Sequence, residues 1–243
     1  MTKMWQIAMV ASSVLFVSFG SASALTVNAD FLSTSGSYSG VGAAPDTGTF
    51  WNIITPTGSP NLYTSGALLA SDGTTNTPVT FSVTNWGTWN FGGTAFASNL
   101  MYDYMYHHSP SSQPGTMNFS FNNLTVGGKY DVYLYSQNGS AANDTSTFSV
   151  GGMPTQSVIN AGAQGSFNLG VNYTVFTNVT AVGGVISGTL AANHGAGSFN
   201  GFQLVQVSST EIPEPTSCVL MALGLVGIGI AVRRRRVRSL RAA

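Results

Sequence analysis

The sequence predicts an all-β fold, an antiparallel β-sandwich or jelly roll, between an N-terminal signal peptide and a C-terminal apolar tail. Apolar and polar residues alternate with a period of two over most of residues 25–210, as in strands with one buried face. Gly, Asn, Pro and Asp interrupt this alternation at intervals of about 8 to 15 residues. No stretch in this region shows the i, i+3, i+4 spacing of a helix. Short strands with such turns favour two packed sheets over alternating strands and helices.

Eleven segments carry the strand pattern, and each is bounded by turn-forming residues. In chain order they are 25–31, 49–54, 79–86, 99–106, 116–124, 130–136, 147–150, 156–160, 173–182, 185–191 and 201–207. The first of them alternates without interruption, which predicts a strand directly after the signal peptide.

Segment 130–136 has the clearest two-sided pattern. One face carries Tyr130, Val132 and Leu134, and the other carries Asp131, Tyr133 and Tyr135. Phe119 and Phe121 lie in the preceding segment, and glycines 127 and 128 lie between the two. We expect these segments to form a hairpin at the centre of the core, with Phe202 and Leu204 packed against it.

Charged residues are scarce between residues 25 and 210, where Lys129 is the only cation. Phosphate binding requires clustered cations, so nucleic-acid binding is excluded. The same scarcity argues against anionic polysaccharide, unless a metal ion bridges the two. The abundance of Ser, Thr and Asn predicts a neutral surface rich in hydroxyl groups.

Residues 1–24 have the pattern of a signal peptide. Lys3 is followed by the mostly apolar stretch 5–19, and residues 21–24 read Ser-Ala-Ser-Ala. Small residues at these positions favour cleavage by signal peptidase after Ala24. The alternative is a retained membrane anchor, which the shortness of the apolar stretch disfavours.

Residues 211–241 combine three features. A Pro-Glu-Pro triplet is followed by the apolar stretch 217–232 and then by an arginine cluster; the residues are Pro213, Glu214, Pro215, Arg233, Arg234, Arg235 and Arg236. The apolar stretch is shorter than the ~20 residues that usually span a bilayer. Arginines can reach the headgroups, so a transmembrane helix is predicted, with the arginines on the cytoplasmic side and the rest of the chain outside.

These features, within residues 211–241, resemble the PEP-CTERM sorting signal. The resemblance implies recognition by an exosortase, an integral-membrane cysteine protease. It also implies transient anchoring in the inner membrane, removal of the tail, and delivery to the cell surface or extracellular matrix. The predicted organisation is a signal peptide over 1–24, a β-sandwich domain over 25–210 and a sorting signal over 211–241.

The exported region resembles the β-sandwich domains that often precede such a tail. Residues 124–135 resemble their L-x-x-G-x-x-Y-x-V-x-L-Y hairpin, and residues 200–204 resemble their closing strand. Residues 42–48, before Phe50, are also similar to that group. The resemblance implies a galactose-binding-like or related jelly-roll fold, which hosts many functions and does not fix one.

Aromatic residues are densest near residues 86–91 and 101–108. Sugar sites stack flat aromatic rings on pyranose C–H groups and fix the hydroxyls with polar side chains. The candidate carbohydrate contacts are therefore Trp86, Trp89, Tyr102, Asp103 and Tyr104. The alternative is that these rings fill the core of the sandwich.

Metal and catalytic sites are less well supported by the sequence. His107 and His108 should point to opposite faces of a strand, so we expect two surface imidazoles and no shared metal. A structural calcium ion could be held by Asp30, Asp46 and Asp72, although no D-x-D-x-D-G loop is present. No other cofactor is expected.

The predicted function is a non-catalytic surface or matrix protein that contacts exopolysaccharide. The chain has no G-x-S-x-G nucleophile motif, and its exported part is poor in carboxylate pairs. The alternative is a polysaccharide hydrolase or lyase that uses aspartates, Asp103 among them, with the histidines at 107 and 108. A third interpretation is a structural surface protein with no ligand.

Overall fold

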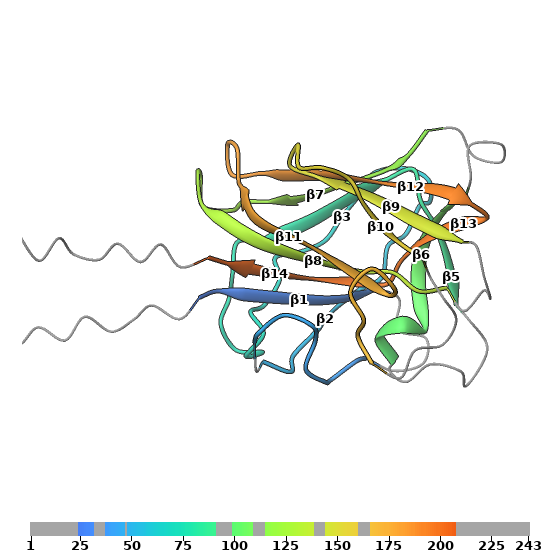
Figure 1. The fold of residues 1–243 in the computed structure, drawn as a ribbon. Helices are drawn as coiled ribbons and strands as arrows, with labels where there is room; N and C mark the ends of the chain where they lie inside the picture. The colour runs from blue at the N-terminus through green and yellow to red at the C-terminus, as the bar shows by residue number, and fades with distance from the viewer. Residues whose placement is uncertain are drawn as a thin grey trace, which may run out of the picture.

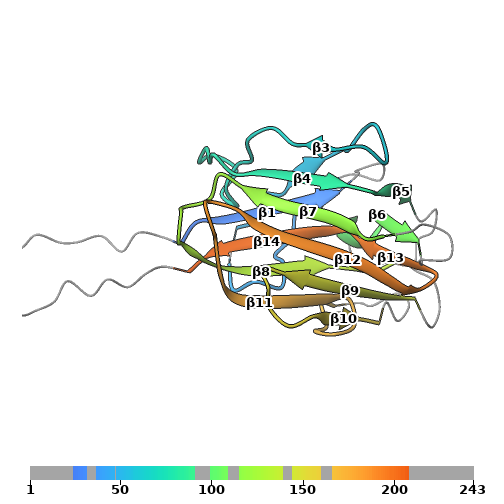
Figure 2. The ribbon, with the colours of Figure 1, turned by 90° about the horizontal axis from the view of Figure 1, so that it is seen from above.

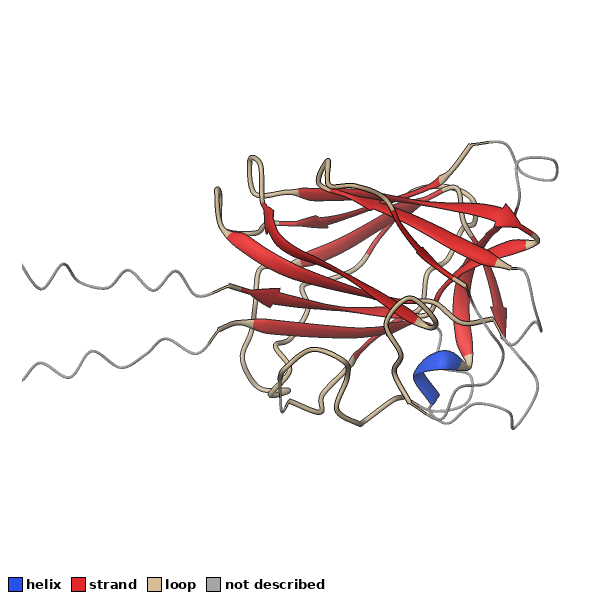
Figure 3. Ribbon diagram, viewed as in Figure 1, coloured by secondary structure: helices blue, strands red, loops and turns tan. Residues whose placement is uncertain are grey.

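The protein is an all-β sandwich in a computed structural model that describes residues 24–31, 37–46, 48–90, 99–108, 115–138, 144–159 and 166–207. Two large sheets stack face to face, and a small third sheet closes one end (Figure 1). Strands dominate the described part, and its one short 3-10 turn lies near the third sheet (Figure 3). The predicted fold class is confirmed.

One large sheet has five strands. Their order across the sheet is β11 (Tyr173–Thr180), β8 (Lys129–Tyr135), β14 (Gly201–Gln206), β1 (Thr26–Phe31) and β2 (Asn52–Ile54). Neighbours run antiparallel except β1 and β2, which pair in parallel. The predicted antiparallel arrangement therefore has an exception at this edge.

The other large sheet has six strands, and Figure 2 shows it stacked on the first. Their order is β10 (Gln156–Val158), β9 (Thr145–Val150), β12 (Ile186–His194), β7 (Met117–Asn122), β4 (Thr80–Thr84) and β3 (Tyr63–Thr64). The third sheet consists of β13 (Ala196–Phe199), β6 (Asp103–His108) and β5 (Gly87–Asn90). The short strands β3, β5 and β13 were not predicted as separate strands.

Aromatic rings from both large sheets and from β13 fill the core. Phe199 is fully buried, and its ring contacts the rings of Phe31, Phe81, Phe119 and Phe148. The inward residues predicted for segment 130–136 belong to the same cluster, and so do Phe202 and Leu204. The alternation read from the sequence therefore identified the core correctly.

The predicted hairpin between residues 116–124 and 130–136 is wrong. Strand β7 pairs with β4 and β12, whereas β8 pairs with β11 and β14 in the opposite sheet. The chain crosses between sheets through a turn in which Gly127 has a φ of 73°, a left-handed conformation that glycine adopts without strain. Both strands face one core from opposite sides, and this arrangement gives the same alternation as a hairpin.

The other face of β8 packs into a second cluster. Tyr135 is buried there with Trp51, Leu100 and Met101. The prediction of one strand over 99–106 is corrected here, because Asn99–Met101 forms the 3-10 turn η1 before β6 begins. A strand would turn the consecutive side chains of Leu100 and Met101 to opposite faces, whereas both pack into this second cluster.

Candidate functional site

The structure does not bring the predicted carbohydrate contacts together on one open surface. Trp86 is 2% exposed, and its indole N–H donates to a backbone carbonyl 3.0 Å away. Asp103 and Tyr104 are also buried, and Tyr102 is half-buried. The side chain of Trp89 lies outside the described residues. The alternative, that aromatic residues here fill the core, holds for Trp86, which belongs to the core cluster.

The two adjacent histidines do face opposite ways, but only one of them is at the surface. His108 is exposed, whereas His107 is fully buried, with its Nε2 3.1 Å from the amide nitrogen of Asn85. Burial lowers the pKa of His107, which favours the neutral imidazole at pH 7. The expectation of two surface imidazoles is wrong for His107. Strand β6 is the central strand of the third sheet, and His107 lies on its buried face.

Asp30 lies in the interior on β1. Its Oδ2 accepts a hydrogen bond from the Tyr38 amide at 3.0 Å, and its Oδ1 is buried without a hydrogen-bond partner. Burial raises the pKa of Asp30 from 3.8 to about 7, and the nearby Asp103 adds to the rise. Such a carboxyl group is protonated through much of the acidic range.

The other two candidate calcium ligands lie together, apart from Asp30. Asp46 and Asp72 both line a depression of about 390 Å³ beside Leu25. Asp72 accepts hydrogen bonds from the hydroxyl group of Thr75 and from the amides of Thr75 and Thr74, and these bonds lower its pKa to about 2. Within the described ranges, no three His, Cys, Asp or Glu side chains are grouped closely enough to hold a metal ion.

Hydroxyl and amide side chains cover the outer face of the six-stranded sheet. They alternate with core residues along each strand, which turns every second side chain outward. Strand register aligns them in two rows across the sheet. The first row is Thr64, Ser82, Ser120 and Ser187, and the second is Thr84, Asn118, Thr189 and Ser149. We call these eight residues the hydroxyl face.

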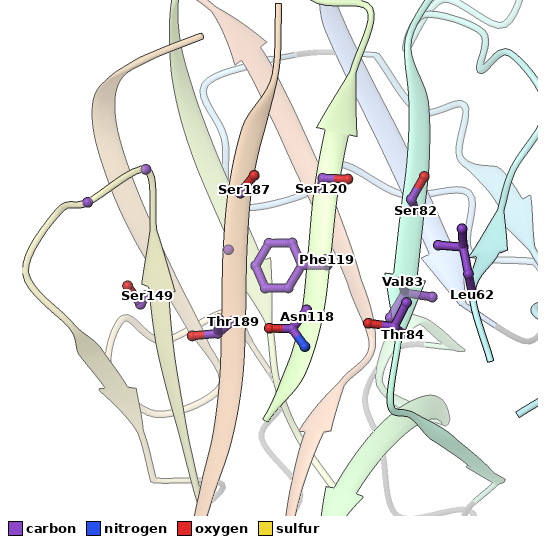
Figure 4. Close-up of a pocket in the computed structure, with 13 residues that line it drawn as sticks. Leu62, Ser82, Val83, Thr84, Asn118, Phe119, Ser120, Ser149, Ser187 and Thr189 are labelled. Carbon is purple, nitrogen blue, oxygen red and sulfur yellow. The ribbon is translucent and has the colours of Figure 1, made fainter. Parts of the chain in front are cut away.

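The residues of the hydroxyl face other than Thr64 line a shallow depression of about 450 Å³ (Figure 4). The depression crosses β4, β7, β12 and β9, and the exposed Leu62 lies at its edge. Neighbouring positions in a row are about 4.8 Å apart, and the two rows are about 7 Å apart, as pleated strands require. No residue that lines the depression carries a charge.

Several hydroxyl groups on this face have no hydrogen-bond partner in the described part of the chain. Ser82 bonds with Thr64 at 2.9 Å and accepts from the Asn122 amide at 3.1 Å. Among the described residues, the side chains of Ser120, Ser187, Thr189 and Ser149 make no such bond. Their donors and acceptors are therefore available to a ligand or to water. The sequence indicated a hydroxyl-rich surface, but only strand register reveals the rows.

Solved structures that are similar to this chain include carbohydrate-binding modules and enzymes. A family 35 carbohydrate-binding module from Clostridium thermocellum shares 17% identity over 51% of this chain and 90% of its own, with a TM-score of 0.32. An exo-β-1,3-galactanase from Phanerochaete chrysosporium, whose structure contains galactose, shares 16% identity over 57% of this chain and 36% of its own, with a TM-score of 0.29. A Podospora anserina GH26-CBM35 β-(1,4)-mannanase shares 8% identity over 61% of this chain and 28% of its own, with a TM-score of 0.31. No curated protein matches the chain.

The C-terminal tail matches a known sorting signal. Residues 211–236 match the PEP-CTERM protein-sorting motif, and this match includes Pro213, Glu214, Pro215 and the cluster from Arg233 to Arg236. These residues lie outside the described ranges, within which no helix is long and apolar enough to cross a membrane. The chain carries a PEP-CTERM sorting motif and is therefore an exported protein, anchored transiently in a membrane and then released to the cell surface.

Proposed function

We propose that the exported domain is a non-catalytic surface or matrix module that contacts neutral exopolysaccharide through the hydroxyl face, after an exosortase has removed the tail. One observation carries the proposal: unbonded hydroxyl groups stand in register across adjacent strands on a surface without charge. The sorting motif supports it independently, because the motif places the domain at the cell surface.

The chemistry of this face suits a polyhydroxyl ligand. Each Ser or Thr offers one donor and two acceptor lone pairs, and each sugar hydroxyl offers the same. Binding such a ligand does not require a charged group to lose its water shell, which would be costly. Phe119 lines the depression, but it is 3% exposed and packs into the core, so its ring is not open to stacking and each contact is weak. Affinity then comes from many contacts along one polysaccharide chain and from the many copies of this protein that bind it in the matrix.

A non-catalytic role is supported by where the acid and base candidates lie. Hydrolysis or elimination needs a general acid and base within hydrogen-bond reach of the substrate. Asp30, Asp103 and His107 are each 1% exposed or less. A polysaccharide chain at the surface cannot reach them in this conformation, which disfavours the hydrolase or lyase alternative.

Removal of the free hydroxyl groups should abolish polysaccharide binding. In native gels that contain the producer's exopolysaccharide or a neutral glucan, wild-type protein should be retarded. The triple variant Ser120→Ala, Ser187→Ala and Thr189→Ala should migrate freely, because it loses the hydrogen bonds and little else. Thr177→Ala, on the exposed face of β11, is the matched control and should be retarded like wild type. Equal retardation of the triple variant would refute the proposed surface, and depolymerisation of the polysaccharide would favour the enzyme.

Neutralising the arginine cluster should block maturation. Replacing the cluster Arg233–Arg236 by Gln removes four of the six arginines that hold the C-terminus on the cytoplasmic side. We expect an uncleaved tail and loss of surface display, measured by immunoblotting of cell fractions. Substitution by Lys keeps the charge and serves as the control. Normal display of the Gln variant would contradict the role assigned to the tail.

A further inference from the structure

Both ends of the domain lie at the same end of the sandwich. The carbonyl of Leu25 accepts a hydrogen bond from the Gln206 amide at 2.8 Å, and Thr26 pairs with Val205. In Figures 1 and 2, β1 begins and β14 ends side by side. Nine residues, 208–216, separate Val207 from the apolar stretch of the tail. They can span at most about 30 Å, so this end of the domain stays near the membrane while the tail is anchored.

Two turns project from this end and lie against each other. The first is Thr125–Gly128, closed by a 2.9 Å bond from the Gly128 amide to the Thr125 carbonyl. The second is 182–185, where Gly183 and Gly184 have φ values of 60° and 80°. Two bonds join the turns: the Leu124 amide donates to the Gly184 carbonyl, and the Gly127 amide donates to the Ala181 carbonyl.

The tips of both turns carry exposed valines. Val126 is 74% exposed and Val182 is 78% exposed, the highest values among large apolar side chains in the described part of the chain. Surface turns normally carry polar residues, so apolar side chains at two adjoining tips need a reason. Lys129, the only cation between residues 25 and 210, begins the strand after the first turn, and its carbonyl accepts from the Val207 amide.

We propose that Val126 and Val182 insert into the interfacial region of the phospholipid bilayer while the tail is anchored, with Lys129 at the level of the phosphates. Apolar tips flanked by a lysine suit this boundary, because the methyl groups leave water and the ammonium group stays hydrated. Asp46 and Asp72 lie beside Leu25 at the same end, so the valines rather than net charge drive the contact. Two valines bind weakly, and the domain leaves the membrane once the tail is cut.

This inference depends on the anchored state and not on polysaccharide binding, and reporters at single positions test it. In a Cys218→Ser background, cysteines replace Val126, Val182 or Asn193 and carry an environment-sensitive fluorophore. Asn193 is the control, because it is exposed and lies near the end of β12 that is remote from both termini (Figure 1). The full chain is reconstituted in vesicles of phosphatidylethanolamine and phosphatidylglycerol, with and without brominated acyl chains.

We expect a blue-shifted emission, and loss of intensity with brominated lipid, at 126 and 182 but not at 193. Adding Val126→Asp to the chain labelled at 182 should reduce that loss, since a carboxylate resists insertion. Positions 126, 182 and 193 are exposed, so the domain should still fold, as circular dichroism would confirm. Equal signals at the three positions, no signal at any, or no effect of Val126→Asp would each overturn the proposal.

Discussion

The variant Asp30→Asn should be more stable than the wild type above pH 7, by up to about 4 kcal/mol, and should lose most of the pH dependence of its stability. This magnitude corresponds to a rise in the pKa of Asp30 from 3.8 to about 7. Asparagine resembles the protonated carboxyl group in shape and can still accept the hydrogen bond from Tyr38. The measurement is the free energy of unfolding in urea between pH 4 and pH 8.

Whether the contribution of Asp30 to stability rises or falls with pH depends on which state, folded or unfolded, binds its proton more tightly. The pKa of Asp30 is higher in the folded state than the ordinary 3.8, so the folded protein holds the proton more tightly. The stability due to this proton is complete below pH 3.8 and falls as the pH rises to about 7. Above that pH the carboxylate is buried and ionised, at a cost that the amide avoids.

Asp72→Asn is the control for Asp30→Asn, because its effect has the opposite sign. Hydrogen bonds from Thr75 and Thr74 lower the pKa of Asp72 to about 2, so the stability that it contributes is present above pH 3.8 and lost in stronger acid. Its replacement should weaken the protein slightly at neutral pH. If Asp30→Asn destabilised the domain at pH 8, or left the pH profile unchanged, the buried state of Asp30 would be refuted.

Phe199→Ala should remove about 3 to 5 kcal/mol of stability, a large part of the total for a typical domain. Phe199 comes from the small third sheet, yet its ring touches rings from both large sheets. Its truncation leaves a cavity where the three sheets meet. Urea unfolding measures the loss. The matched control is Phe50→Ala, since Phe50 is 37% exposed and should cost far less. Similar losses for the two variants would contradict the assigned core.

Sequence periodicity predicted which residues face inward, but not which strands pair. Phe119 and Phe121 were correctly assigned to the core together with Val132, although β7 and β8 lie in opposite sheets. Side-chain alternation depends only on which face is buried, whereas pairing depends on contacts distant in the chain. The parallel pairing of β1 with β2 has no local signal for the same reason.

The candidate site was only partly accessible from sequence. The excess of Ser and Thr correctly suggested a neutral surface. The aromatic residues predicted to contact carbohydrate, however, are not part of the hydroxyl face. Trp86 has the side chain of a sugar platform, and its burial depends on tertiary packing that no local pattern encodes. The hydroxyl rows arise because Ser82, Ser120 and Ser187 fall in register, although they are far apart in the chain. By contrast, the sorting motif is contiguous, so the sequence alone revealed it.

The intact mass of the protein purified from its native host tests most directly the claim that this chain is exported and processed. The full chain has a mass of 25.2 kDa. We predict a smaller product that begins at Leu25 and ends before the apolar stretch 217–232. A mass of 25.2 kDa, or a product that still carries the arginine cluster, would contradict the account.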